Sequence, residues 1–103
     1  MRDPTDLSGA EQEQEAHAAE AQRIALQQAE DIKWLLAHEA GRRIVWRMLE
    51  QTGAFRNPFN HSGSVTAFNC GQMNIGQWLL SEITTHRPEA YLKMLQEHRK
   101  NDD

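Results

Sequence analysis

Two segments of this chain carry helical patterns of apolar residues with a glycine inside each, and these patterns constrain the fold most. The first runs from Glu39 to Gly53 and contains Gly41, and the second is centred on residues 71–80 and contains Gly76. A glycine inside a helix costs about 1 kcal/mol relative to alanine. We therefore expect Gly41 and Gly76 to mark places where helices pack closely, and we assign neither of them a chemical role.

A long helical segment precedes this pair. Ser8 and Glu11 have the spacing of a capping box, in which each side chain bonds to a free amide at the start of a helix. Small or apolar residues then recur at steps of three or four, which places them along one side of a helix: Ala18, Ala21, Ala25, Ala29, Ile32 and Leu36. If this helix continues to His38, it is about 45 Å long. We expect residues 1–7 to be mobile.

The second glycine-containing helix is expected to start at Ser62 or Ser64 and to end near Thr85. Its spacing predicts one inward-facing stripe: Val65, Phe68, Gln72, Ile75, Gly76, Leu79, Leu80 and Ile83. The first helix is expected to face inward with Gly41, Ile44, Val45, Met48, Leu49 and Thr52, and Gly53 suits a left-handed helix end. Between the two helices lies a loop of turn-forming residues, and we expect Phe55 and Phe59 to fold back over the core.

Pro88 is well placed as the first residue of a last helix, whose inward residues would be Tyr91, Leu92, Met94 and Leu95. No segment shows the alternation of a β-strand. We therefore predict an all-α protein, a small helical bundle of three to four helices with a long N-terminal helical arm. Residues 1–30 form the arm, which is acidic and rich in Ala, Glu and Gln, and residues 31–103 form the bundle.

Charge is distributed unevenly between these parts. Residues 1–31 contain eight acidic residues against Arg2 and Arg23, a net charge of −6, whereas residues 32–103 have a net charge of +2. Such asymmetry can indicate a tail with its own partner. No apolar run approaches the roughly 20 residues that a membrane-spanning helix needs. The single cysteine, Cys70, makes an intrachain disulfide impossible and favours a reducing compartment.

The residue pattern does not favour a chemical centre. A zinc site commonly draws ligands from tight local pairs, and the histidines and Cys70 form no such pair. No nucleophile is placed beside an oriented base, and the glycine spacing of residues 71–76 lacks the Lys-Ser/Thr of a phosphate-binding loop. We expect no catalytic residues, no metal and no cofactor, and hence no enzyme.

A helix-turn-helix DNA-binding regulator remains an alternative, because Arg42, Arg43 and Arg47 cluster on the first helix. The loop of about ten residues is longer than the three or four residues of that motif. The presumptive recognition helix has no Lys or Arg through Ile83, although phosphate contacts dominate affinity for DNA. Specific nucleic-acid binding is therefore not the favoured interpretation.

Contacts with other protein chains are the favoured interpretation. The three tryptophans are the best candidates for such contacts, because tryptophan often dominates binding interfaces and Trp46 and Trp78 lie beside the apolar stripes. They could instead form walls of the bundle's own core. The candidate interface residues are Ala18, Ala21, Ala25, Ile32, Trp34, Trp46, Phe55, Phe59 and Trp78.

Three blocks of sequence resemble those of a family of small proteins of tailed bacteriophages that is named after a Bordetella phage member. These are residues 41–53, residues 71–80 and the run from Pro88 to Leu92, in matching order and spacing. The resemblance covers roughly residues 31–97. Two features depart from it: Gln72 and Met73 stand where basic residues are usual, and the acidic arm, residues 8–30, lies outside the shared region.

The resemblance implies a structural protein of the virion, encoded near portal and head genes of podophages. Its partners would be other virion proteins, such as portal, adaptor or tail proteins, in a multicopy symmetric assembly formed in the host cytoplasm. An internal, ejected virion protein is an alternative on the same grounds. A small inhibitor of a host enzyme, which would be absent from purified particles, is a further one.

Overall fold

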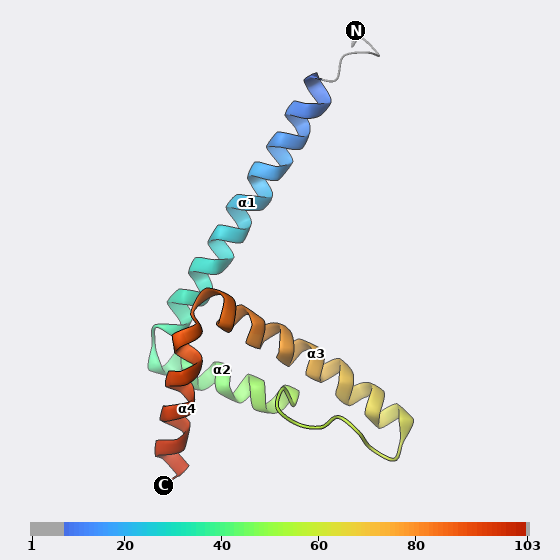
Figure 1. Ribbon diagram of the computed structural model, residues 1–103, viewed down its shortest axis with the longest axis vertical. Coiled ribbons are helices and arrows are strands. Elements are labelled where there is room, and N and C mark those ends of the chain that lie inside the picture. The colour runs from blue at the N-terminus through green and yellow to red at the C-terminus, as the bar shows by residue number, and fades with distance from the viewer. Residues whose placement is uncertain (1–7, 103) are drawn as a thin grey trace. The chain divides into compact units, whose positions relative to one another are not determined.

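The chain is described here by a computed structural model that covers residues 8–102, with the side chains of residues 9–99 (Figure 1). These residues form four helices and no strand: α1 (Ser8–Leu36), α2 (Glu39–Thr52), α3 (Gly63–His86) and α4 (Pro88–Asp102). The predicted all-α bundle with a long N-terminal helix is confirmed. The predicted mobility of residues 1–7 and the hydroxyl cap of Ser8 lie outside the described residues and side chains. The chain divides after Glu30 into two units.

The first unit contributes the α1 residues up to Glu30. All side chains from residue 10 to residue 28 are exposed, including Ala18, Ala21 and Ala25 of the predicted alanine side, whereas Ala29 is half-buried. Arg23 donates two hydrogen bonds to the Glu20 carboxylate. This guanidinium holds the pKa of Glu20 below its usual range, because it favours the charged form of the acid. The arm is thus a helix with almost no buried surface of its own.

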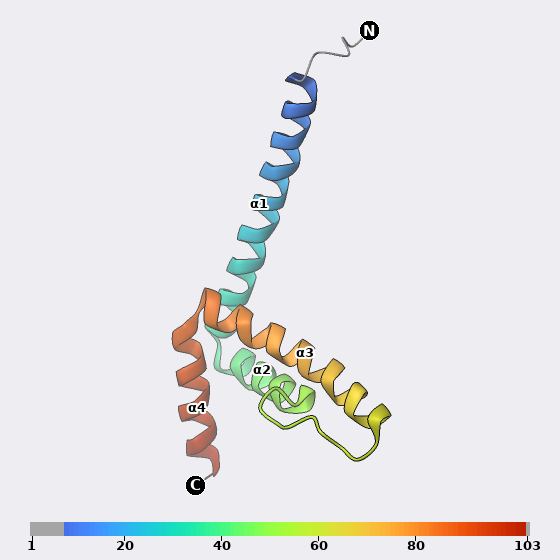
Figure 2. The same ribbon diagram turned by 45° about the vertical axis from the view of Figure 1, so that its right-hand side comes forward.

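The second unit is built on a hairpin of α2 and α3, with α4 packed against both helices (Figures 1 and 2). Gly53 ends α2 in the left-handed conformation with φ of 70°, as predicted, and the Ala54 N–H donates to the Leu49 carbonyl at 3.1 Å. Ser62 is the cap of α3, since its hydroxyl accepts a hydrogen bond from the Val65 N–H. Pro88 starts α4, also as predicted.

One cluster of side chains from all four helices and the loop forms the core of this unit. It comprises Leu36, Val45, Leu49, Ala54, Leu79, Ile83, Ala90 and Met94. Half-buried Ile32, Leu35, Trp46, Leu80 and Tyr91 pack against it. The last turn of α1 therefore belongs to the bundle.

Both helical glycines lie where other backbone or side-chain atoms approach closely. A Cβ at Gly76 would contact the Thr52 hydroxyl and lie 2.9 Å from the Ala54 Cβ. A Cβ at Gly41 would meet the Leu35 carbonyl group. Since real Cβ atoms do not come so close to neighbours, the two approaches require glycine.

The predicted inward stripes were wrong at several positions. Val65, Phe68 and Ile75 of α3 are exposed, as are Ile44 and Met48 of α2. The buried positions follow the glycines instead: Gly76, Leu79 and Ile83 in α3, and Gly41, Val45 and Leu49 in α2. Because the glycines allow the closest approach, the line of contact runs through them and not through the bulky residue beside each.

Two further expectations about inward-facing residues fail. Phe59 does not cover the core: it is 68% exposed, and its ring contacts His61 within the loop. Phe55 folds back only in part, being 49% exposed while its ring lies 5.9 Å from that of Trp46. Leu92 of α4 points to solvent, and the small Ala90 occupies the core instead.

Candidate interaction surface

Two of the three tryptophans are largely exposed. Trp34 is 67% and Trp78 59% exposed, whereas Trp46 is half-buried. Burying a large aromatic side chain is strongly favourable, and tryptophan is often a dominant residue in binding interfaces, so these two side chains are candidates for an interaction surface. Of the other predicted interface residues, Ile32 packs against the core of its own bundle.

One face of α3 collects large exposed apolar side chains. It consists of Phe68, Ile75 and Trp78, called the α3 face below, and each of them is at least 59% exposed. Their spacing of seven and three places them on one side of the helix, about 80–160° round from Gly76. The predicted inward stripe placed Phe68 and Ile75 in the core, so this face was not expected from the sequence. Counting helical steps from Gly76, and not from the largest residues, would have found it.

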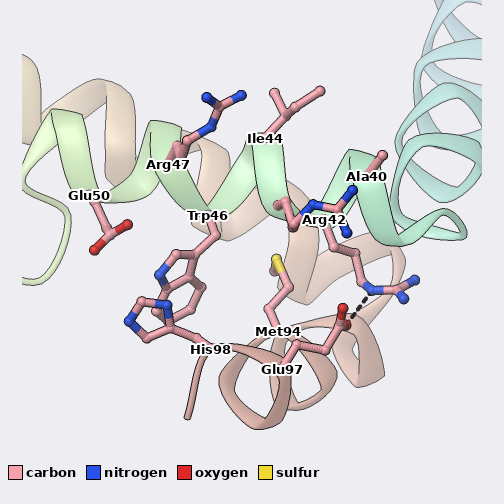
Figure 3. Close-up of a pocket in the computed structure, with 10 residues that line it drawn as sticks. Ala40, Arg42, Ile44, Trp46, Arg47, Glu50, Met94, Glu97 and His98 are labelled. Carbon is pink, nitrogen blue, oxygen red and sulfur yellow. Dashed lines mark hydrogen bonds and ion pairs between the residues drawn. The ribbon is translucent and has the colours of Figure 1, made fainter. Parts of the chain in front are cut away.

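A second candidate is an open groove of about 550 Å³ along α2 and α4 (Figure 3). Trp46 and Arg42 project from α2 toward α4, where Met94, Glu97 and His98 meet them. The other lining residues come from α2: Ala40, Arg43, Ile44, Arg47 and Glu50. The lining thus combines apolar side chains with both charges, and its three arginines outnumber its two glutamates.

Arg42 is fixed within the wall of the groove (Figure 3). It is 6% exposed, its Nε donates to Glu97 at 2.6 Å, and its Nη1 donates to the Leu36 carbonyl at 2.9 Å. The Leu36 carbonyl is one of the acceptors that the end of α1 leaves open. A single side chain therefore joins the end of α1, the start of α2 and the last turns of α4. The sequence offered no signal for this pair, which is separated by 55 positions.

Trp46 lies in a row of aromatic rings. Its ring centroid is 4.7 Å from that of His98 and 5.9 Å from that of Phe55, and Phe55 in turn lies 6.3 Å from Tyr91. The Trp46 Nε1 is buried and has no hydrogen-bond partner among the described residues. Aromatic packing therefore fixes this residue, and the row anchors the loop to α4.

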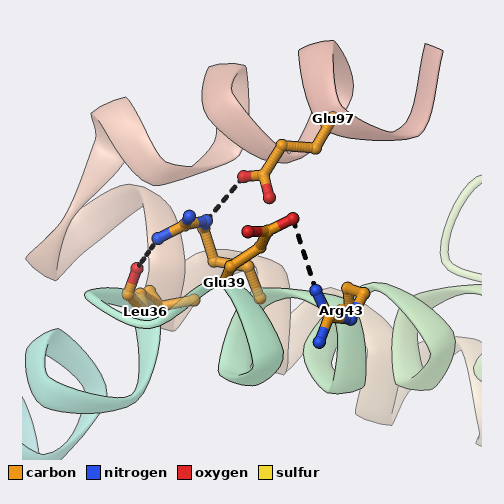
Figure 4. Close-up of polar contacts among 5 residues, drawn as sticks. Leu36, Glu39, Arg43 and Glu97 are labelled. Atoms are coloured by element: carbon orange, nitrogen blue, oxygen red, sulfur yellow. Dashed lines mark hydrogen bonds and ion pairs between the residues drawn. The ribbon is translucent and has the colours of Figure 1, made fainter. Parts of the chain in front are cut away.

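The burial of Arg42 bears directly on the DNA-binding alternative. Only Arg43 and Arg47 of the predicted arginine cluster are exposed, and Arg43 lies 3.3 Å from Glu39 in an ion pair (Figure 4). Arg42, paired with Glu97, is not presented to a phosphate. The basic cluster that the sequence indicated is thereby reduced to two side chains.

Three other features were looked for in the described part of the chain: a metal site, a membrane-spanning helix and a disulfide. Within residues 9–99 no three His, Cys, Asp or Glu side chains gather as they would around a metal ion. None of the helices described combines the length and the apolar composition needed to cross a membrane. Cys70 is exposed on α3 and forms no disulfide.

A protein-family model described as Bbp19-like phage protein matches residues 32–96, which span the bundle and leave out the arm. This is not a known enzyme family. No curated protein and no solved structure matches the chain. The match begins at Ile32, one residue after the boundary between the two units, so the shared part of the family is the bundle.

Proposed function

The chain belongs to the Bbp19-like phage protein family, and from this premise we propose that it is a structural protein of the virion. In this proposal it binds other virion proteins in several copies, at the portal or head-to-tail junction or on the tail. Apolar surface rimmed by polar residues marks sites of protein contact. The observation that carries the proposal is the α3 face, where Phe68, Ile75 and Trp78 stand exposed together.

The small size of the bundle supports the same proposal. A core of eight buried hydrophobic residues can stabilise a unit of this size by only about 3–5 kcal/mol. Contacts with a ring of larger proteins would add to this, since weak contacts that are repeated by symmetry or linked together bind far more tightly than one alone.

Mass spectrometry of purified particles is the first test, and the protein is expected among their components. A sharper version compares Trp78→Ala with Leu92→Ala in a phage that carries the variant gene. Both side chains are about 60% exposed, but Leu92 belongs to α4 and is not part of the α3 face. Trp78→Ala should lower the amount in particles at least tenfold, and Leu92→Ala should not. Absence of the unaltered protein from particles would refute the structural role.

An internal, ejected protein is the second candidate within the same class. It would be present in full particles and lost from particles that have released their DNA, whereas a component of the portal or tail would be retained. Chemical crosslinking followed by mass spectrometry identifies the neighbouring protein in either case.

A DNA-binding regulator has less support, because Arg42 is buried in an ion pair with Glu97 and α3 contains no Lys or Arg.

A further inference from the structure

We propose that the groove along α2 and α4 binds the α1 arm, residues 8–30, of a second copy of this chain. This inference rests on the proposed multicopy assembly and adds to it one specific contact between copies. Opposite charge, matching spacing of that charge, and apolar surface on both sides each support it.

The groove has an excess of positive charge. Its lining includes Arg42, Arg43 and Arg47 against Glu50 and Glu97, a net charge of +1 with His98 neutral. Glu97 neutralises Arg42 directly, which leaves exposed Arg43 and Arg47 against one exposed carboxylate, that of Glu50, in the lining. These two are exposed and four residues apart, so they repel each other on one side of α2. The positive charge of Arg43 is offset only in part, because its ion-pair partner Glu39, at 3.3 Å, is exposed to solvent.

The arm carries the opposite charge in the same spacing. Residues 8–30 contain five glutamates and one arginine, a net charge of −4. Glu11 and Glu15 are both exposed and are also four apart, which makes them a second like-charged pair on one side of a helix. Two helices that lie side by side can place one pair against the other, since each spans one turn. The repulsion within each pair is then replaced by attraction between the pairs.

Apolar surface is available on both sides of this contact. Ile44 is 45% exposed at the groove, and Trp46 and Met94 line its inner part. On the arm, exposed Ala18 and Leu26 (61% exposed) lie on the same side of the helix as Glu15, about one and three turns further along, whereas Ile24 lies on the opposite side. A solitary helix with so little buried area is only marginally stable in water, so the arm gains order by docking. A helix of one copy in the groove of the next is a head-to-tail contact, the kind that closes into a ring.

Sedimentation of the full-length protein at low and high salt tests the proposal. We expect oligomers at low salt that dissociate at least tenfold more readily at 0.5 M salt, because exposed charges are screened. The double variant Arg43→Glu, Arg47→Glu should be monomeric, and so should Glu11→Arg, Glu15→Arg. Mixed in equal amounts, these two variants should associate, since each supplies the charge that the other needs.

The control is Lys93→Glu, Arg99→Glu, which reverses two exposed cations of α4 that do not line the groove and should leave association unchanged. If circular dichroism shows the Arg43→Glu, Arg47→Glu variant to be unfolded, the variant Arg43→Gln, Arg47→Gln removes the same attraction without adding negative charge.

A chain that is monomeric at all concentrations, or two variants that fail to associate on mixing, would overturn the proposal. A monomeric chain that is still found in purified particles would overturn the contact between copies while leaving the structural role intact, and a different virion protein would then occupy the groove.

Discussion

At the scale of single residues, two glycines of α3 differ in how much space surrounds them: neighbouring atoms crowd Gly76, whereas the space beside Gly71 is open. A Cβ at Gly76 would contact Thr52 and Ala54, whereas nothing lies within 4 Å of a Cβ at Gly71. Gly76→Ala should therefore destabilise the fold by about 1–3 kcal/mol through overpacking. Gly71→Ala should stabilise it by about 0.5–1 kcal/mol through helix propensity. Urea denaturation of both variants measures this, and equal shifts of the same sign would show that Gly76 is not a contact point.

The Arg42–Glu97 pair makes a second prediction at this scale. Glu97→Ala leaves a buried guanidinium without its carboxylate, and we expect a loss of about 2 kcal/mol. Glu39→Ala removes the exposed carboxylate that pairs with Arg43 and should cost less than about 1 kcal/mol. Thermal unfolding at pH 7 compares the two. Similar losses for both variants would mean that the buried pair contributes no more than a surface pair.

At the scale of the helices, the arm and the bundle should be separable. Deleting residues 1–28 removes no residue of the core cluster, so the remaining bundle should unfold cooperatively within a few degrees of the full chain. The same deletion should abolish incorporation into particles if the arm docks on a neighbour. Circular dichroism and quantification of the truncated protein in purified particles measure the two effects. Normal incorporation would show that the arm has no docking role.

For the molecule as a whole, a small core predicts modest stability. The isolated protein should unfold with a free energy of about 3–5 kcal/mol in urea, since few apolar side chains are fully buried. Copies held in a particle should resist proteolysis more strongly, because binding to the folded state alone adds stability. A free energy above about 10 kcal/mol for the isolated monomer would contradict this, and would weaken the argument that the bundle depends on partners.

The four helices, their ends at Gly53, Ser62 and Pro88, and the close approach at Gly41 and Gly76 could all be inferred from the sequence. These features depend on residues near in the chain: a cap, a proline that fixes one dihedral angle, and glycines within a helical pattern. The acidic arm and the phage protein family were also evident, because charge and motif spacing are properties of the sequence itself.

Which side of each helix is buried was decided only by the tertiary structure. Periodicity assigns residues to a face but does not measure how closely two helices approach, and at Gly76 the approach moved the contact line away from Phe68 and Ile75. The Arg42–Glu97 pair and the groove behind it likewise join residues more than 50 positions apart. Such contacts exist only once α4 packs on α2, so the exposed surfaces of the bundle are a product of packing and not of local sequence.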